Sequence, residues 1–234
     1  MEPIWAPFLN FMKLFKRIAI IIFLIACFTT WTIMTLIDTG AVHGMSTKWL
    51  KFGTIAMCFV FSLIHCKNVK SHLFIGAMLF TMISDWILVL CFNYKTIWIA
   101  LVTFSISQIF HMLDMKEMKN LKWTLIRRAI LFVLLSILVC VLNGFNVISI
   151  LTAFYAANLI LNIVDASRVK IKGHVLMVIG FILFLLCDIC VGWAMSQFTG
   201  NIMPLDYFAG FGMWLFYVPS QALLVFANYY RFEK

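Results

Sequence analysis

The sequence predicts an all-α, polytopic membrane protein, and three observations support this prediction. Hydrophobic residues make up 64% of the 234 residues and charged residues only 12%, and the mean hydropathy is +1.03. One soluble core of this size cannot bury so much apolar surface. The apolar residues also occur in runs close to the ~20 residues that a helix needs to cross a bilayer. A soluble enzyme, a disordered chain and a secreted disulfide scaffold are therefore excluded.

We expect a single transmembrane domain over residues 1–234 with eight spans. The apolar runs cover about 18–37, 49–66, 72–91, 96–113, 128–143, 146–164, 173–196 and 207–228. Each run is expected to be helical, because lipid offers no hydrogen-bond partner to a free backbone group. The first run is too long for a signal peptide and no cleavage site follows it, so we expect it to be retained.

Basic residues predict the orientation of the spans. Only three of the 18 Lys and Arg residues, Lys48, Lys51 and Lys95, fall on one side of the predicted membrane. Because cytoplasmic loops are rich in Lys and Arg, both termini should be cytoplasmic. The net charge of +9 is then explained by topology and lipid headgroups, and nucleic-acid binding is not expected. We expect a multi-pass protein of a bacterial cell membrane.

Two aspartates lie inside apolar runs, Asp85 in the third and Asp188 in the seventh. A carboxyl at such a depth costs several kcal/mol when ionised, and such residues commonly mark functional sites. The third and seventh runs point in the same direction, and both aspartates lie about 20 Å from the cytoplasmic edge. Two acids at one depth, four spans apart, would fit an acid–base pair in two parallel four-helix halves. We expect their carboxyls in one cavity, within roughly 10 Å of each other.

Uncharged polar residues on neighbouring spans are candidates to surround these acids. They are Gln108 and His111 in the fourth run, Tyr155 and Asn158 in the sixth, and Tyr217 and Gln221 in the eighth. Tyr155 and Tyr217 should lie near the depth of Asp188, with Gln108, Asn158 and Gln221 about a turn deeper. A polar ring around two acids is typical of a buried binding site, although such groups also join helices.

No sequence motif indicates a metal or another cofactor. Cys187 and Cys190 form a C-x-x-C pair, but a zinc site needs about four ligands and no second pair accompanies it. Serine-hydrolase, zinc-protease and nucleotide-binding motifs are also absent from the sequence. We therefore expect no cofactor.

At these residues the chain resembles the YhhN-like membrane proteins, the lysoplasmalogenase family. That family has G-D in its third span, F-x-x-x-H-x-x-Y in its fourth, F-x-x-S-D in its seventh and Y-x-x-x-Q in its eighth. The corresponding residues are Ser84-Asp85, Phe104-x-x-x-Gln108-x-x-His111, Phe184-x-x-Cys187-Asp188 and Tyr217-x-x-x-Gln221. Both aspartates and Gln221 agree with the pattern, whereas Ser84, Gln108, His111 and Cys187 depart from it.

The resemblance implies hydrolysis of the vinyl-ether bond of a lysoplasmalogen to a fatty aldehyde and a glycerophospho-alcohol. Asp85 and Asp188 would then be the catalytic acid and base. The lysophospholipid would lie within the bilayer, with its phosphate near Lys51. Two other functions stay open from the residues alone. Paired acids in parallel repeats also suit a proton-coupled membrane carrier, and the chain could be a non-catalytic lipid-binding protein.

Overall fold

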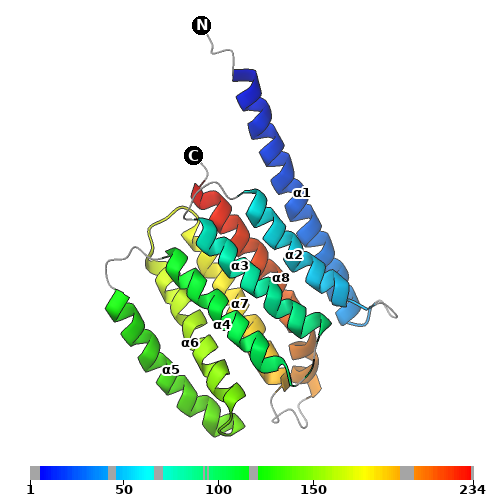
Figure 1. Cartoon of the computed structure of the whole chain (residues 1–234). Helices are drawn as coiled ribbons and strands as arrows, with labels where there is room; N and C mark the ends of the chain where they lie inside the picture. The colour runs from blue at the N-terminus through cyan, green and yellow to red at the C-terminus, as the bar shows by residue number, and fades with distance from the viewer. Residues whose placement is uncertain are drawn as a thin grey trace.

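The computed structural model describes residues 6–41, 46–65, 71–91, 93, 95–115, 121–195 and 203–232. Within these ranges helices joined by short turns make up the chain, and no strand occurs (Figure 1). The α-helices are α1 (Ala6–Asp38), α2 (Lys48–Ile64), α3 (Ser71–Asp85), α4 (Ile97–Met115), α5 (Leu121–Asn143), α6 (Val147–Arg168), α7 (His174–Met195) and α8 (Met203–Phe232). A π-helical turn, η1 (Trp86–Leu90), continues α3. The all-α fold predicted from composition is confirmed.

Seven of the described helices are long and apolar enough to cross a membrane, with η1 counted as part of α3. An integral, multi-pass membrane protein is therefore confirmed. The exception is α2, which has 17 residues and includes Lys48 and Lys51 in its first turn. The expected 2–3 loop and most of the segment before α8 lie outside the described residues.

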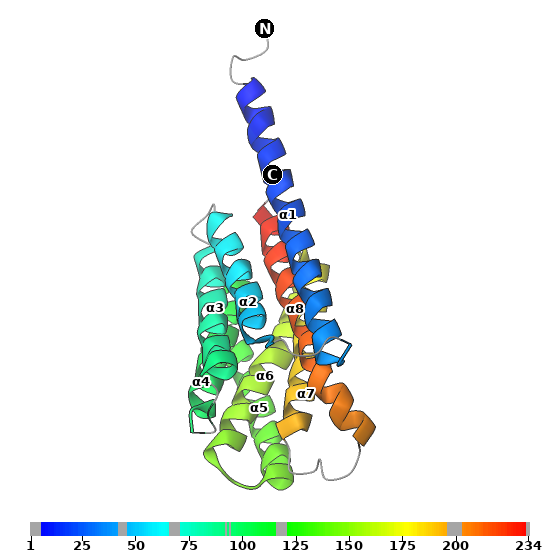
Figure 2. The same ribbon diagram turned by 90° about the vertical axis from the view of Figure 1, so that its right-hand side faces the viewer.

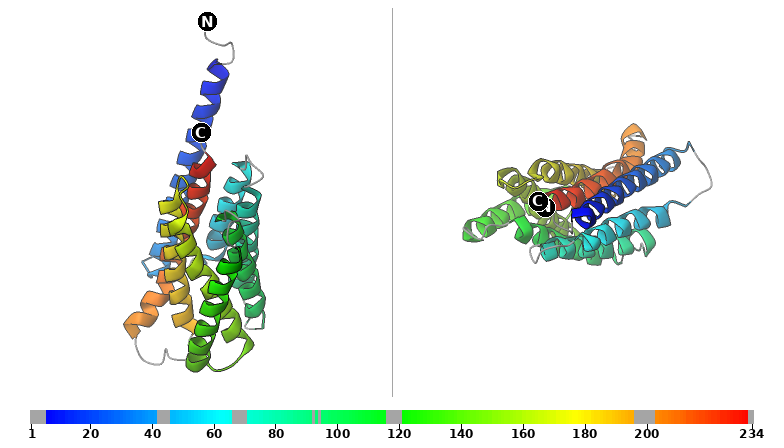
Figure 3. Two further views of the ribbon diagram at one scale, coloured as in Figure 1. Left: turned by 90° about the vertical axis from the view of Figure 1, so that its left-hand side faces the viewer. Right: turned by 90° about the horizontal axis from the view of Figure 1, so that it is seen from above.

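The helices form two facing layers. In one layer α2, α3 and α4 lie side by side, and in the other α8, α7 and α6 do so (Figures 1 and 2). Helix α1 packs against α8 and α2, while α5 packs on the outside of α6. The start of α1 and the end of α8 lie at the same end of the elongated bundle (Figure 3). This arrangement leaves α1 and α5 as the most exposed helices.

The surface of the bundle is apolar and its interior contains many polar groups, the reverse of a soluble protein. Large apolar side chains are exposed on the outer helices, among them Ile21 and Ile25 of α1 and Val133, Ile137 and Val141 of α5. Polar side chains are fully buried between the layers, among them Thr81, Ser107, Gln108, Asn162 and Gln221. Hydrocarbon is the favourable solvent for such a surface. Some of the buried polar groups bond across helices, as Thr81 does with Ser107 at 2.8 Å.

A glycine lies about two turns before each membrane aspartate and brings two helices close together. A Cβ atom at Gly76 of α3 would lie 2.6 Å from the Phe110 ring of α4, and one at Gly180 of α7 would lie 2.9 Å from Leu224 of α8. Only a residue without a side chain allows so close an approach. These contacts fix the rotation of the two helices that carry Asp85 and Asp188.

Pro219 interrupts the hydrogen bonding of α8 close to Tyr217. Because proline has no N–H, the carbonyl of Leu215, four residues earlier, loses its intrahelical donor. The indole Nε1 of Trp31, on α1, donates to that carbonyl at 3.1 Å. Helix α1 therefore supports α8 at the level of Tyr217.

The fifth helix begins seven residues before its predicted span, at Leu121 instead of residue 128. Arg127 and Arg128, which the hydropathy pattern assigns to the edge of a loop, therefore lie on α5. The physical reason is pairing across helices: both guanidinium groups bond Asp165 of α6, so these charges remain within a packed helix.

Candidate functional site

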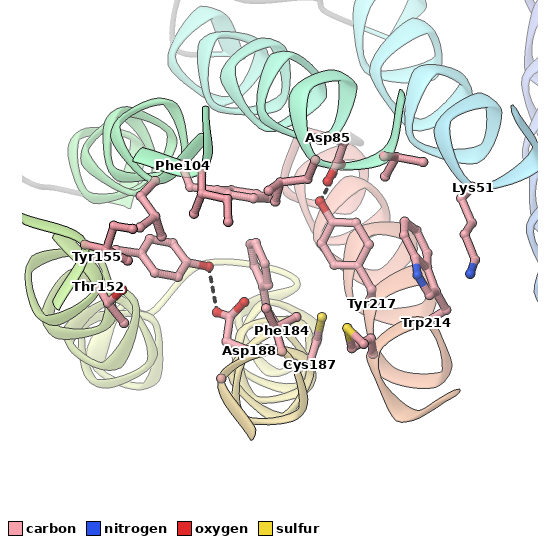
Figure 4. Close-up of a pocket in the computed structure, with 18 of the residues that line it drawn as sticks. Lys51, Asp85, Phe104, Thr152, Tyr155, Phe184, Cys187, Asp188, Trp214 and Tyr217 are labelled. Carbon is pink, nitrogen blue, oxygen red and sulfur yellow. Dashed lines mark hydrogen bonds between the residues drawn. The ribbon is translucent and has the colours of Figure 1, made fainter. Parts of the chain in front are cut away.

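A cavity of about 1120 Å³ lies between the two layers, toward the end of the bundle opposite the start of α1. Its volume is slightly above the ~300–1,000 Å³ that is typical of small-molecule sites. Both Asp85 and Asp188 line it, together with Tyr155 and Tyr217. The structure thus brings the two acids and the two tyrosines of the same predicted depth into one cavity (Figure 4).

Asp85 lies at the last turn of α3 and is only 3% exposed. The hydroxyl of Tyr217, on α8, donates a hydrogen bond to Asp85 Oδ2 at 2.5 Å. Tyr217 is itself 4% exposed, so water has little access to this bond. A short bond to a buried hydroxyl fixes the carboxyl orientation.

Asp188 lies on α7 and has the same kind of partner. The hydroxyl of Tyr155, on α6, donates to Asp188 Oδ2 at 2.6 Å. Figure 4 shows the second oxygen of Asp188 pointing into the cavity, away from Tyr155. No other described side chain donates a hydrogen bond to either carboxyl. One oxygen of each acid therefore has no side-chain donor in the part of the chain that the structure describes, and it can interact with a ligand.

Aromatic rings separate the two acid–tyrosine pairs. The ring of Phe184, on α7, lies 5.4 Å from the ring of Tyr217, and the ring of Phe104, on α4, lies 5.7 Å from that of Tyr155. No described Lys, Arg or His side chain forms an ion pair with either acid. The acids therefore share an apolar chamber with aromatic walls, in which electrostatic interactions are stronger than in water.

The π-helical turn begins immediately after Asp85. The N–H of Cys91 donates to the carbonyl of Trp86, five residues earlier, at 3.1 Å. Leu88 and Val89 of this turn both line the cavity. Such turns often accompany functional sites. The sequence analysis did not find this turn, because no proline or glycine marks it.

Lys51 lies at the opposite side of the cavity from Tyr155 (Figure 4). Its Nζ forms an ion pair with Asp38 at 2.8 Å and lies 5.0 Å from the centre of the Trp214 ring. Lys48 and Thr47 line the cavity nearby. This part of the cavity is polar and carries two amines, in contrast to the aromatic centre.

Four predicted site residues, Gln108, His111, Asn158 and Gln221, do not line the cavity. They are buried about a turn or more deeper in the bundle. The Nδ2 of Asn162 donates to Gln108 Oε1 at 2.8 Å, and the His111 ring packs edge-on against Phe181. The structure therefore places these side chains in interhelical packing, beyond reach of a ligand that lies between the two acids.

A buried charged cluster at the other end of the bundle was missed from the sequence. Arg128 is 6% exposed and donates to Asn158 Oδ1, Asn162 Oδ1 and Asp165 Oδ2, each at 2.9 Å. Arg127 donates to Asp165 Oδ1, also at 2.9 Å. Asn158, Asn162 and Asp165 occur at helical spacing on one face of α6, and this pattern was the available signal. Since the cluster does not line the cavity, its role is to join α5 to α6.

A second ion pair joins α4 to α8 at the same end. Arg231 Nη1 lies 2.9 Å from Asp114 Oδ2, and the Asp114 side chain is 1% exposed.

Within the described residues no group of three His, Cys, Asp or Glu side chains is placed to hold a metal ion. Of the three aspartates that line the cavity, Asp38 pairs with Lys51, whereas Asp85 and Asp188 have no basic partner among the described residues.

Comparison of the chain with family models, with curated proteins and with solved structures finds no match.

Proposed function

We propose that the protein is a membrane lipid hydrolase that resembles lysoplasmalogenase and cleaves the vinyl-ether bond of a lysoplasmalogen. The observation that carries this proposal is the pair of carboxyls in one intramembrane cavity, each held by a tyrosine hydroxyl. Paired carboxyls with one free oxygen each are suited to acid-catalysed cleavage at an ether carbon. The sequence resemblance supplies the identity of the bond.

The proposed reaction uses one carboxyl as acid and the other as carboxylate. The acid donates its proton to the alkenyl carbon, which leaves an oxocarbenium ion on the adjacent carbon. The carboxylate stabilises this cation and accepts a proton from water as the water oxygen bonds to that carbon. The hemiacetal then collapses to a fatty aldehyde and a glycerophospho-alcohol, and the proton passes back to regenerate the acid. Tyr155 and Tyr217 would orient the two carboxyls.

The cavity suits a single-chain amphiphile. At one end Lys48 and Lys51 outnumber the single carboxylate of Asp38, which pairs with Lys51, so a net positive charge remains for a phosphate. The aromatic walls suit the apolar part of the molecule. The site would operate within a bacterial cell membrane, without a cofactor.

The test is aldehyde release from a lysoplasmalogen by purified protein in detergent, followed through a coupled aldehyde dehydrogenase. The matched control substrate is the lysophospholipid with the same headgroup and an ester in place of the vinyl ether. We expect aldehyde from the first lipid only. If neither lipid reacts and a pH gradient drives solute uptake in proteoliposomes, the carrier function is correct instead. Specific bound lipid without either activity would indicate a lipid-binding protein.

We further propose that all eight helices cross the membrane and that both termini are cytoplasmic. Reporters inserted at residues 42–45 and 66–70 should report opposite sides, because α2 lies between them. Reporters at residues 197–202 and at Lys234 should also report opposite sides, with Lys234 cytoplasmic. Alkaline phosphatase activity and green fluorescence provide the two readouts. Equal signals on both sides of α2 would reduce the count to seven spans.

A further inference from the structure

The cavity is not enclosed by the bundle on all sides. Its wall includes Val139 and Leu142 of α5, and Val191 and Gly192 of α7. The Leu142 side chain is 50% exposed, and Gly192 is exposed as well. These two residues therefore belong both to the cavity wall and to the outer surface. We refer to Val139, Leu142, Val191 and Gly192 as the α5–α7 opening.

One face of α6 connects this opening to the acids. Ile148, Thr152 and Tyr155 occur at positions i, i+4 and i+7 and all line the cavity. Tyr155, at the inner end of this row, is the residue that bonds Asp188. The path from the surface to the carboxyl is thus continuous along a single helix face.

Exposed apolar side chains flank the α5–α7 opening, as expected for a surface that contacts hydrocarbon. Val141 on its α5 side is 77% exposed and Ile189 on its α7 side is 57% exposed. Gly192 also makes the opening wide, since a Cβ atom at this position would meet no atom within 4 Å. Gly192 follows Asp188 by four residues, which is one helical turn, or about 6 Å along α7.

We infer that the alkyl chain of a single-chain amphiphile enters the cavity sideways from the lipid through the α5–α7 opening, passing Gly192. Figure 4 shows the order Asp188, Asp85, Lys51 across the cavity. If the alkyl chain lies in the opening and the phosphate lies near Lys51, the bond that joins the alkyl chain to the headgroup lies between the two acids. The inference rests on the proposed function for the identity of the amphiphile, but the route of the chain follows from the cavity itself.

The test is photolabelling by a lysophosphatidylcholine whose chain ends in a diazirine, followed by mapping of the labelled peptides. In the unaltered protein we expect labelling at residues 139–142 and 189–192 that excess unlabelled lysolipid abolishes. Gly192→Trp should lower this saturable labelling by about tenfold, the effect of excluding two methylene groups from an apolar site. The matched control is Gly53→Trp, because Gly53 on α2 also has open space at its Cβ and does not line the cavity.

Three results would overturn the inference. They are equal saturable labelling of the two tryptophan variants, saturable labelling confined to α1 and α2, and labelling that excess lysolipid never reduces. Leu142→Trp blocks the opening from its other flank and replaces Gly192→Trp if that variant does not fold. Photolabelling requires no hydrolysis, so saturable labelling at the opening without aldehyde release would disprove the proposed function while the chain route stands.

Discussion

Replacing either Asp85 or Asp188 by asparagine should lower the rate of aldehyde release by about 10²–10⁴-fold, the range for a lost acid or base. Asparagine preserves shape and polarity but cannot exchange a proton at useful pH. The double variant should be little slower than the slower single variant, because residues that act as one unit are not additive. The measurement is the steady-state rate on a lysoplasmalogen in detergent.

Tyrosine-to-phenylalanine changes provide the matched controls. Tyr155→Phe and Tyr217→Phe each remove the tyrosine hydroxyl that donates to a carboxyl. The aspartate that exchanges the proton stays in place. We expect a smaller loss than for the aspartate variants. Gel-filtration profiles should match that of the unaltered protein for all four single variants. If both asparagine variants keep more than about half of the rate, the paired-carboxyl mechanism is wrong.

Arg128→Met should be the most destabilising change outside the cavity. Methionine fills much of the same volume but leaves the carboxylate of Asp165 with Arg127 as its remaining cation. The change also removes the donors to the buried Oδ1 atoms of Asn158 and Asn162, and two unsatisfied buried acceptors cost about 2–6 kcal/mol. The measurement is the free energy of unfolding in mixed detergent micelles, determined by far-ultraviolet circular dichroism.

Arg127→Met is the control that distinguishes the effect of burial from the effect of charge. Arg127 bonds the same carboxylate, but its side chain is 33% exposed against 7% for Arg128. Arg127→Met should therefore cost only about 0–1 kcal/mol. Equal effects of the two arginine variants would contradict the account of the cluster.

The depth of the two aspartates along their helices was predictable from the sequence, but their contacts with other helices were not. Asp85 and Asp188 stand out because a carboxyl inside an apolar run is rare, and counting residues from the span ends placed both at one level. The same counting put Tyr155 and Tyr217 at that level. It could not show that each tyrosine would bond an aspartate, because this depends on helix rotation and on which helices are neighbours.

The departures from the sequence analysis have the same origin. Gln108 and Gln221 lie about a turn deeper than the acids and are buried between helices instead of lining the cavity. Gln108 Nε2 and Gln221 Oε1 have no hydrogen-bond partner among the described residues. Arg128 lies inside a packed helix although hydropathy places it at a boundary, since hydropathy carries no information on a partner such as Asp165. The π-helical turn after Asp85 reflects local packing that a single sequence does not display.

The two contacts made by α8 near Pro219 have a consequence for biosynthesis. Tyr217 bonds Asp85 across 132 residues of chain, and Leu215 accepts from Trp31 across 184. α8 is the last of the described helices to leave the ribosome, so until then Asp85 has no tyrosine and the Trp31 indole has no acceptor. An unfinished chain thus differs from the finished protein by two unpaired polar groups within the lipid.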